Sequence, residues 1–347
     1  MQDLVISSGQ ALNAYLTSCS MNNITISEGG KLDYNLNEED FETRDYSVLV
    51  GSETNIAEGT IYYQGEGPAQ GQCVDGVFTG LSGTYRLGIG EGVSAIDPII
   101  GTSETGKARL YVFSGGYVSG GVIGQSGDID VFPNGYVEDV TIGGYVADSR
   151  FQTGICLYGG TAGNLMVSSN GYLTIYSDGQ MTGSAIVKEG GSMHVYSGAI
   201  IQSADIQGGY IRVYGSATVN NLSVSTGNVS IYQSGNVGTA TIESGNLSAY
   251  SSANITSISI GNDGVGKIYG SAIVSNAYIN SASGAQIYGT ATITTLNIDN
   301  AVVSIYNSAK ITNANLLNNG ILYTPTASSG LSITSMYIYN ASGRTCK

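Results

Sequence analysis

The sequence predicts an all-β fold, a parallel β-solenoid in which about 18–19 residues form each coil. Three observations predict this fold. A pair made of an apolar residue and a tyrosine recurs along most of the chain, and apolar residues keep fixed distances from that tyrosine. The composition includes 51 glycines and 25 tyrosines but only 11% charged residues, which excludes a coiled coil and a charge-rich disordered protein.

The tyrosine repeat sets the length of the coil. Its members follow one another at nearly constant spacing, at Tyr158, Tyr176, Tyr196, Tyr214, Tyr232, Tyr250, Tyr269, Tyr288, Tyr306 and Tyr323. Phe113 and Phe132 extend the series upstream at a similar spacing. The step from Phe132 to Tyr158 is distinctly longer than the others, so we expect an insertion near Asp148–Thr153. A propeller blade needs ~40 residues and a sandwich has no reason to repeat one pattern, so both alternatives are disfavoured.

Five apolar columns accompany the tyrosine. Ile, Val, Leu and Ala predominate one place before it and three, five, eight and ten places after it, with mostly polar residues between. This alternation in short runs, interrupted by Gly, Asn and Ser, predicts short β-strands. One repeat cannot bury its own apolar side, but stacked repeats form a continuous core. The column five places after tyrosine supplies the predicted core stack Val219, Val237, Ile255, Val274 and Ile293.

Two regions differ in regularity. Residues 107–347 hold the regular solenoid repeats and a C-terminal cap. Residues 1–106 are predicted to form an irregular N-terminal solenoid or capping region, with an acidic loop at Asn37–Asp45 and a glycine-rich loop at Gly65–Gly71. Residues 1–150 hold 20 acidic and 6 basic side chains, whereas residues 151–347 hold 6 of each. The resulting net charge of −14 disfavours nucleic acid and anionic lipid as partners.

Several functional classes lack their sequence signals. No long apolar stretch is present, so a transmembrane helix is not expected. The first residues have neither the basic nor the apolar segment of a signal peptide. The 4 cysteines lie far apart without a C-x-x-C pair, so no zinc or redox motif is expected. We therefore expect no cofactor and no metal site.

Several turns resemble those of the AIDA-type repeat family. The matching segments are Val5-Ile-Ser-Ser-Gly-Gln10, Ile26-Ser-Glu-Gly-Gly-Lys-Leu32, Val112-Phe-Ser-Gly-Gly-Tyr-Val118 and Val187-Lys-Glu-Gly-Gly-Ser-Met193. That family supplies the passenger regions of self-associating autotransporter adhesins and related bacterial surface proteins. The resemblance implies a right-handed parallel β-helix, an extracellular or cell-surface location, and adhesion or self-association as the function. It also implies O-glycosylation on Ser or Thr by a glycosyltransferase.

The tyrosine column is the predicted binding surface. Because the residue before each tyrosine belongs to an inward column, the tyrosine itself points outward. Stacked coils place successive rings ~4.8 Å apart, close enough to pack in an offset stack. The alternative is that the column only stabilises the solenoid. The predicted binding residues, for a glycan, another cell-surface ligand or a second copy of the chain, are Tyr196, Tyr214, Tyr232, Tyr250, Tyr269 and Tyr288.

A row of hydroxyl side chains lies two places after the tyrosines. Hydroxyl groups at such positions can form hydrogen bonds along the turn. The family resemblance further implies that they are candidate O-glycosylation positions. The row consists of Ser216, Ser234, Ser252, Ser271, Thr290 and Ser308.

The sequence holds few groups suited to catalysis, and we predict that the protein is not an enzyme. The single histidine, His194, lies where neighbouring repeats carry polar residues, so we expect it to face solvent. Asp128 and Asp130 share one face of a strand, and we interpret them as a solvated acidic face. They are also the best candidates for a hydrolase carboxylate pair or a calcium site. The alternatives to an adhesin are therefore a polysaccharide-binding or polysaccharide-cleaving β-helix and a phage or secreted fibre.

Overall fold

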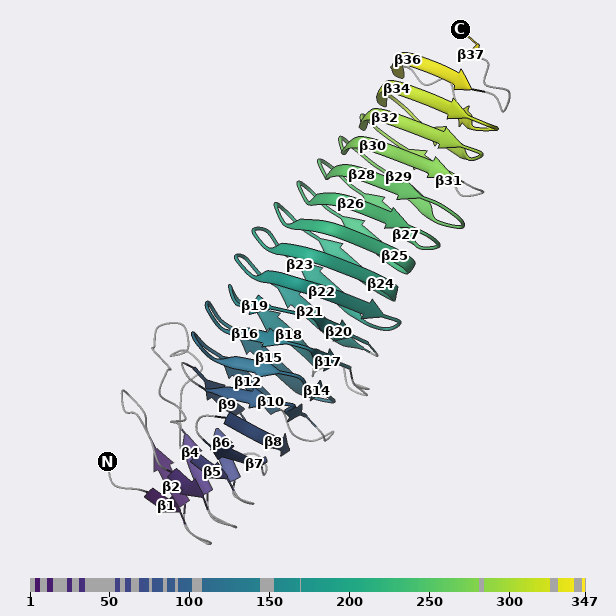
Figure 1. Ribbon diagram of the computed structural model, residues 1–347. Coiled ribbons are helices and arrows are strands. Elements are labelled where there is room, and N and C mark those ends of the chain that lie inside the picture. The colour runs from purple at the N-terminus through teal and green to yellow at the C-terminus, as the bar shows by residue number, and fades with distance from the viewer. Residues whose placement is uncertain are drawn as a thin grey trace. The chain divides into compact units, whose positions relative to one another are not determined.

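The computed structural model resolves the chain into two compact units, Met1–Gly183 and Ser184–Lys347, which we call unit 1 and unit 2 (Figure 1). The boundary between them falls within one strand, β22 (Gln180–Lys188). The structure describes residues 4–6, 11–14, 24–26, 31–34, 54–56, 60–63, 69–74, 77–83, 86–90, 93–101, 108–143, 153–168, 170–280, 284–324, 330–339 and 345–346.

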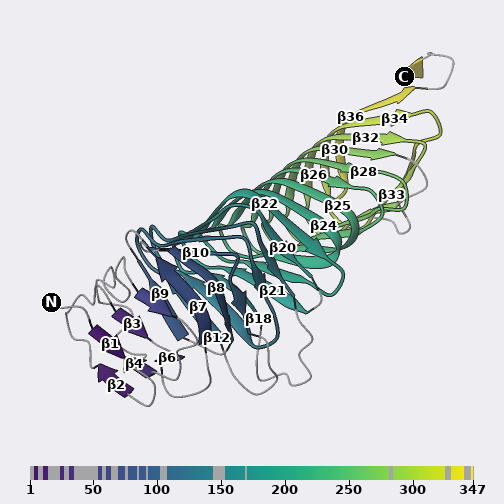
Figure 2. The same cartoon turned by 60° about the horizontal axis from the view of Figure 1, so that its bottom comes forward.

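Unit 1 is built from short strands, three to a coil in its regular part. β12, β13 and β14 of one coil pair in parallel with β15, β16 and β17 of the next. These pair in turn with β18, β19 and β20, as Figure 1 shows, and β12, β18 and β21 mark coils of the same stack in Figure 2. Its strands are β1 (Leu4–Ile6), β2 (Ala11–Ala14), β3 (Ile24–Ile26), β4 (Lys31–Tyr34), β5 (Thr54–Ile56), β6 (Thr60–Tyr63), β7 (Ala69–Val74), β8 (Val77–Gly83), β9 (Arg86–Ile89), β10 (Ser94–Ile96), β11 (Ile99–Ile100), β12 (Ala108–Val112), β13 (Tyr117–Ser119), β14 (Val122–Ile123), β15 (Gly127–Val131), β16 (Tyr136–Glu138), β17 (Val140–Ile142), β18 (Thr153–Leu157), β19 (Thr161–Ala162), β20 (Leu165–Val167) and β21 (Gly171–Ile175).

Unit 2 repeats the same coil with longer strands. A strand such as β26 or β28 contains two consecutive outward residues in the middle of its alternation, which divides its inward positions between two sides of the coil. This accounts for the three-place step between the apolar columns five and eight places after tyrosine. Its strands are β23 (Ser192–Val195), β24 (Ile200–Val213), β25 (Thr218–Ile231), β26 (Asn236–Ile242), β27 (Asn246–Ala249), β28 (Asn254–Ile260), β29 (Val265–Ile268), β30 (Ile273–Asn280), β31 (Gly284–Ile287), β32 (Thr292–Asp299), β33 (Val302–Ile305), β34 (Lys310–Leu317), β35 (Ile321–Tyr323), β36 (Ser332–Tyr339) and β37 (Thr345–Cys346).

The core of unit 2 consists of the predicted apolar columns. Parallel registers place the stack from Val219 to Ile293 one coil above another, with each side chain at most 1% exposed. All five columns are buried in this unit except at Leu316, which is half-buried. The predicted β-solenoid is therefore confirmed, and no helix occurs among the residues that the structure describes.

A sixth core column, three places before the tyrosine, was not among the predicted ones. It contains Met193, Ile211, Val229, Leu247, Ala285 and Val303, all buried. Gly266 interrupts this column because Ile260 already fills the space: a Cβ at Gly266 would lie 2.2 Å from Cδ1 of Ile260. The column can hold a residue without a side chain because the neighbouring column supplies the missing volume.

The structure corrects the position of Tyr323 in the tyrosine series. Tyr323 pairs with Ser304, so it lies two places before the tyrosine column rather than within it. The turn between β34 and β35 holds residues 318–320, whereas the corresponding turn between β32 and β33 holds only residues 300–301. The extra residue makes the register step between these coils 19 residues, as from Ser304 to Tyr323, whereas Tyr323 follows Tyr306 by only 17 residues and so falls two places short of the column.

Several predictions concern residues outside the described part of the chain. These are the acidic loop at residues 37–45, most of the glycine-rich loop at 65–71 and the insertion near 148–153, of which only Thr153 is described. Within residues 1–106, the described strands β1, β3 and β5 pair in parallel, as do β2, β4 and β6. The strands β7 and β8 pair antiparallel. The division at residue 106 stays a prediction.

Candidate functional site

The tyrosines of unit 2 form one continuous stack. Neighbouring ring centroids are 4.5 to 5.2 Å apart, and neighbouring ring planes differ by only 3 to 11°. Parallel registers of the underlying strands produce this alignment because each tyrosine follows directly after a paired strand. The stack runs through Tyr196, Tyr214, Tyr232, Tyr250, Tyr269, Tyr288 and Tyr306.

Stacking decides which part of each tyrosine can meet a ligand. The rings are half-buried, since the two neighbours of each inner ring cover both of its faces. What remains outward is the ring edge and the phenolic hydroxyl, which both donates and accepts hydrogen bonds. A ligand therefore meets a line of hydroxyl groups and ring edges on this column, not open aromatic faces.

A shorter aromatic stack lies in unit 1. Phe113 and Phe132 are 5.0 Å apart, Phe132 and Tyr158 are 5.7 Å apart, and Tyr158 and Tyr176 are 4.8 Å apart. Burial first, and then the nearby Cys156 thiol and Asp130 carboxylate, raise the pKa of Tyr158. The phenol at this position therefore stays protonated at neutral pH.

The predicted hydroxyl row borders the tyrosine stack of unit 2. Its members are exposed, apart from the half-buried Ser308. The Oγ atoms of Ser216 and Ser197 lie 2.8 Å apart, and Thr290 Oγ1 donates to the carbonyl of Gly270 at 3.3 Å. Ser271 Oγ donates to the carbonyl of Ser251 at 3.2 Å. The hydroxyls thus link successive turns while staying accessible from outside.

His194 points outward as predicted, but it is half-buried rather than fully solvated. Its ring centroid lies 6.3 Å from Tyr196, 5.7 Å from Tyr210 and 6.1 Å from Tyr214. The guanidinium of Arg212, in the next coil, lies 5.0 Å from the Tyr210 ring centroid. Burial, and then the charge of Arg212, lower the pKa of His194, so the imidazole is neutral at pH 7.

We expect His194 to make folding stability sensitive to mild acid. The unfolded chain has the ordinary, higher pKa and binds protons first, so this contribution is fully present above about pH 6.5 and is lost below it. Stability should therefore fall between pH 7.5 and pH 5.5, by a small amount because the imidazole is partly exposed to solvent. Urea unfolding at both pH values should show a smaller difference for His194→Gln than for the parent. An equal difference in the two proteins would contradict the assignment.

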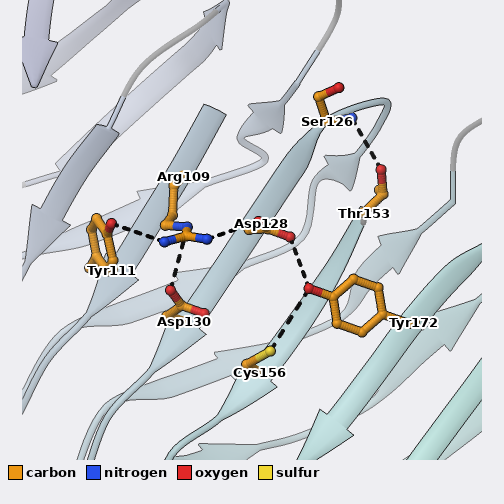
Figure 3. Close-up of polar contacts among 8 residues, drawn as sticks. All are labelled: Arg109, Tyr111, Ser126, Asp128, Asp130, Thr153, Cys156 and Tyr172. Carbon is orange, nitrogen blue, oxygen red and sulfur yellow. Dashed lines mark hydrogen bonds and ion pairs between the residues drawn. The ribbon is translucent and has the colours of Figure 1, made fainter. Parts of the chain in front are cut away.

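The pair Asp128 and Asp130 does not form the solvated acidic face that the sequence predicts. The two residues are only 4% and 8% exposed, and the inward and outward sides of β15 are both buried. Arg109 lies between their side chains (Figure 3). Its Nη2 is 3.4 Å from Asp128 Oδ2, and its Nε is 3.6 Å from Asp130 Oδ2. The prediction of a solvated face is therefore wrong, because alternation fixes the side of the strand but not whether that side is covered.

Tyr172 completes this cluster from two coils away. Its hydroxyl donates to Asp128 Oδ1 at 3.2 Å and lies 3.9 Å from the Sγ of Cys156. Gly154 stands between Asp128 and Tyr172 in the stack of strands. A Cβ there would lie 2.7 Å from the Tyr172 ring, so glycine is required for the hydroxyl to reach across.

The electrostatics of the cluster favour a fixed ion network. Burial alone would lower the pKa of Arg109, but Asp130, Tyr111 and Asp128 outweigh it and raise that pKa. Burial, followed by the charges of Asp130 and Asp128, raises the pKa of the Cys156 thiol to about 12. Cys156 is thus protonated and not a nucleophile at neutral pH. Among the described residues, no group of three His, Cys, Asp or Glu side chains could hold a metal ion.

Sequence reasoning missed Arg109, Tyr111, Tyr172 and Cys156 as partners of the aspartates. A signal was present for the first two, because Arg109 precedes Asp128, and Tyr111 precedes Asp130, by one full repeat. The same step separates Phe113 from Phe132, so these residues had to be neighbours in adjacent coils. Tyr172 carried no such signal, because the insertion before residue 153 obscures the count.

Comparisons with known proteins add little to this description. No family model matches the chain, and no curated protein matches it. Among solved structures, the chain is similar to one described as the crystal structure of the TibC-catalysed hyper-glycosylated TibA55-350 fragment. The two are 18% identical with a TM-score of 0.43, over 95% of this chain and 94% of that chain. This likeness is too distant to bear on function. Within the described residues, no helix has the length and apolar character needed to cross a membrane.

Proposed function

We propose that this protein is a bacterial surface or secreted β-solenoid that acts by adhesion or self-association through the tyrosine stack of unit 2. The observation that carries the proposal is the register of that stack. Seven tyrosine rings are stacked with neighbouring centroids 4.5 to 5.2 Å apart, and each ring directs the same edge outward. Each edge offers one weak contact, and identical contacts in a row act together on a repetitive partner.

The accessible hydroxyl row supports a second part of the proposal. Ser216, Ser234 and Ser252 are exposed beside the stack, at the same point of successive coils. We infer that this row, with Ser271, Thr290 and Ser308, is available to a glycosyltransferase for O-glycosylation. An extracellular or cell-surface location follows from the proposal, since adhesion requires it.

The proposal is one of binding and not of catalysis. The best carboxylate pair, Asp128 and Asp130, is buried and ion-paired to Arg109. Hydrolysis of a glycosidic bond needs carboxyl groups that flank the scissile bond, with access for the sugar. Burial of both carboxylates supports a structural role for this pair.

The test removes hydroxyl groups and keeps the stack. In the triple variant Tyr214→Phe, Tyr232→Phe and Tyr250→Phe, the rings still pack, so the free energy of unfolding should stay within about 1 kcal/mol of the parent. Self-association, measured by analytical ultracentrifugation, or glycan binding, measured on an array, should fall about tenfold, because three outward hydrogen-bonding groups are lost.

Replacement of the three tyrosines by phenylalanine is a better test than replacement by serine. Serine has no ring, so it would also remove four stacking contacts, from Tyr196–Tyr214 to Tyr250–Tyr269. A matched control is Tyr278→Phe, which removes a hydroxyl from a different strand of the same unit. If the triple Phe variant associates and binds as the parent does, the stack is structural only.

A further inference from the structure

The strands that carry the tyrosine stack of unit 2 present two more outward rows. Side chains two and four places before each tyrosine share its side of the strand. The row two places before runs His194, Arg212, Ser230, Ser248, Lys267, Gln286 and Ser304, and we call it the cationic row. The row four places before runs Ser192, Tyr210, Asn228, Asn246, Val265, Gly284 and Val302.

The charge on these rows is opposite to that of the whole chain. The chain carries a net charge of −14, yet the two rows contain Arg212 and Lys267 and no carboxylate. The acidic residues of unit 2 lie outside these rows, in turns, such as Glu243, or at other positions of the coil, such as Asp299 on β32 and Asp205, which lies on β24 seven places before Arg212. A local cationic strip on an acidic protein attracts an anionic ligand to this strip alone.

The spacing of the two cations is fixed by the strand register. Arg212, Ser230, Ser248 and Lys267 occupy matching positions in successive coils. Three coil steps therefore separate the two cations, which is ~14 Å. The side chains between them are short and half-buried serines, so nothing long stands between the cations. Arg212 is exposed, and its guanidinium is held 5.0 Å from the Tyr210 ring centroid.

The neighbours of the cationic row suit a sugar. The hydroxyls of Tyr232 and Tyr250 border it on one side. The amides of Asn228 and Asn246 border it on the other, joined by a hydrogen bond of 3.1 Å from Asn246 Nδ2 to Asn228 Oδ1. Phenols and amides both donate and accept hydrogen bonds, as sugar hydroxyls require. Guanidinium and ammonium groups bind carboxylates by charge-assisted hydrogen bonds.

From this arrangement we propose that the cationic row binds an acidic polysaccharide with carboxylate-bearing sugars, and that Arg212 and Lys267 each contact a carboxylate. This inference rests on the proposed binding role of the tyrosine face and names its ligand class. The faces of the tyrosine rings are covered by neighbouring rings, so they cannot stack on the bases of a single-stranded nucleic acid. The outward phenols and amides can still form hydrogen bonds with the hydroxyl groups of a sugar polymer.

The test compares one polymer in charged and neutral forms. The full chain should bind polygalacturonate oligosaccharides in isothermal titration calorimetry at low salt, and their methyl esters about tenfold more weakly. The double variant Arg212→Gln and Lys267→Gln should lose at least about tenfold in affinity for the charged form and little for the ester. Lys310→Gln is the matched control, because it removes an exposed cation from another part of the coil and should bind as the parent does.

Any one of four results would overturn the inference. The parent could fail to bind polygalacturonate, it could bind the methyl ester equally well, or Lys310→Gln could lose as much affinity as the double variant. Self-association that falls in the double variant with no polymer present would identify the acidic part of a second copy as the occupant instead. Equal binding of the ester would leave the proposed function intact, since the triple Phe variant tests that function separately, by self-association or by binding to a glycan array.

Discussion

Ile255→Asp should unfold the solenoid around the substituted coil and lower the free energy of unfolding by on the order of 4–5 kcal/mol. Ile255 is 0% exposed and lies between Val237 and Val274 in the stack of parallel strands. An aspartate there would lie among buried apolar side chains, so its charge would lose its hydration. It also replaces apolar contacts with both neighbouring coils, so the damage extends beyond one repeat.

The matched control for this substitution is Thr256→Asp, which places the same charge at the next position along the same strand. Thr256 is exposed, so its aspartate keeps its hydration and should change stability by less than about 0.5 kcal/mol. Urea unfolding followed by circular dichroism measures both variants. Similar midpoints for Ile255→Asp and Thr256→Asp would mean that the assignment of inward and outward positions is wrong.

Arg109→Met should have the second largest effect, a loss of about 3–5 kcal/mol. The substitution keeps much of the side-chain volume but leaves Asp128 and Asp130 buried without their cation. Tyr172 still donates a hydrogen bond to Asp128, which offsets only part of the loss. Lys310→Met, which removes an exposed cation, should change stability by less than about 0.5 kcal/mol.

A rescue experiment distinguishes the ion network from simple packing. Adding Asp128→Asn and Asp130→Asn to Arg109→Met removes the unpaired charges and should restore most of the lost stability. If the triple variant is no more stable than Arg109→Met, lost packing rather than unpaired charge explains the effect. The same two asparagine substitutions bear on catalysis, since any polysaccharide hydrolysis that they abolish would contradict the binding role.

The sequence predicts the candidate surface in part. The outward phase of the tyrosines and their spacing follow from the strand pattern, because alternation fixes the side of each residue and the repeat fixes the distance between coils. The partners of His194 do not follow from this pattern. Tyr210 stands in a place where the next two coils carry Asn228 and Asn246, so no repeat signal marks it. Only the tertiary structure shows that the ring centroid of Tyr210 lies 5.7 Å from that of His194.

The coil length, the apolar columns from Val195 to Ala314 and the outward tyrosines could all be read from the sequence, since each of these depends on a local pattern repeated many times. The coordinates were needed to show that the outward side of β15 is covered, which turns Asp128 and Asp130 from surface carboxylates into a buried ion network with Arg109. They were also needed for the register of Tyr323. Both cases have the same cause: alternation tells which way a side chain points, whereas burial and register depend on turn lengths and on distant segments that no local pattern encodes.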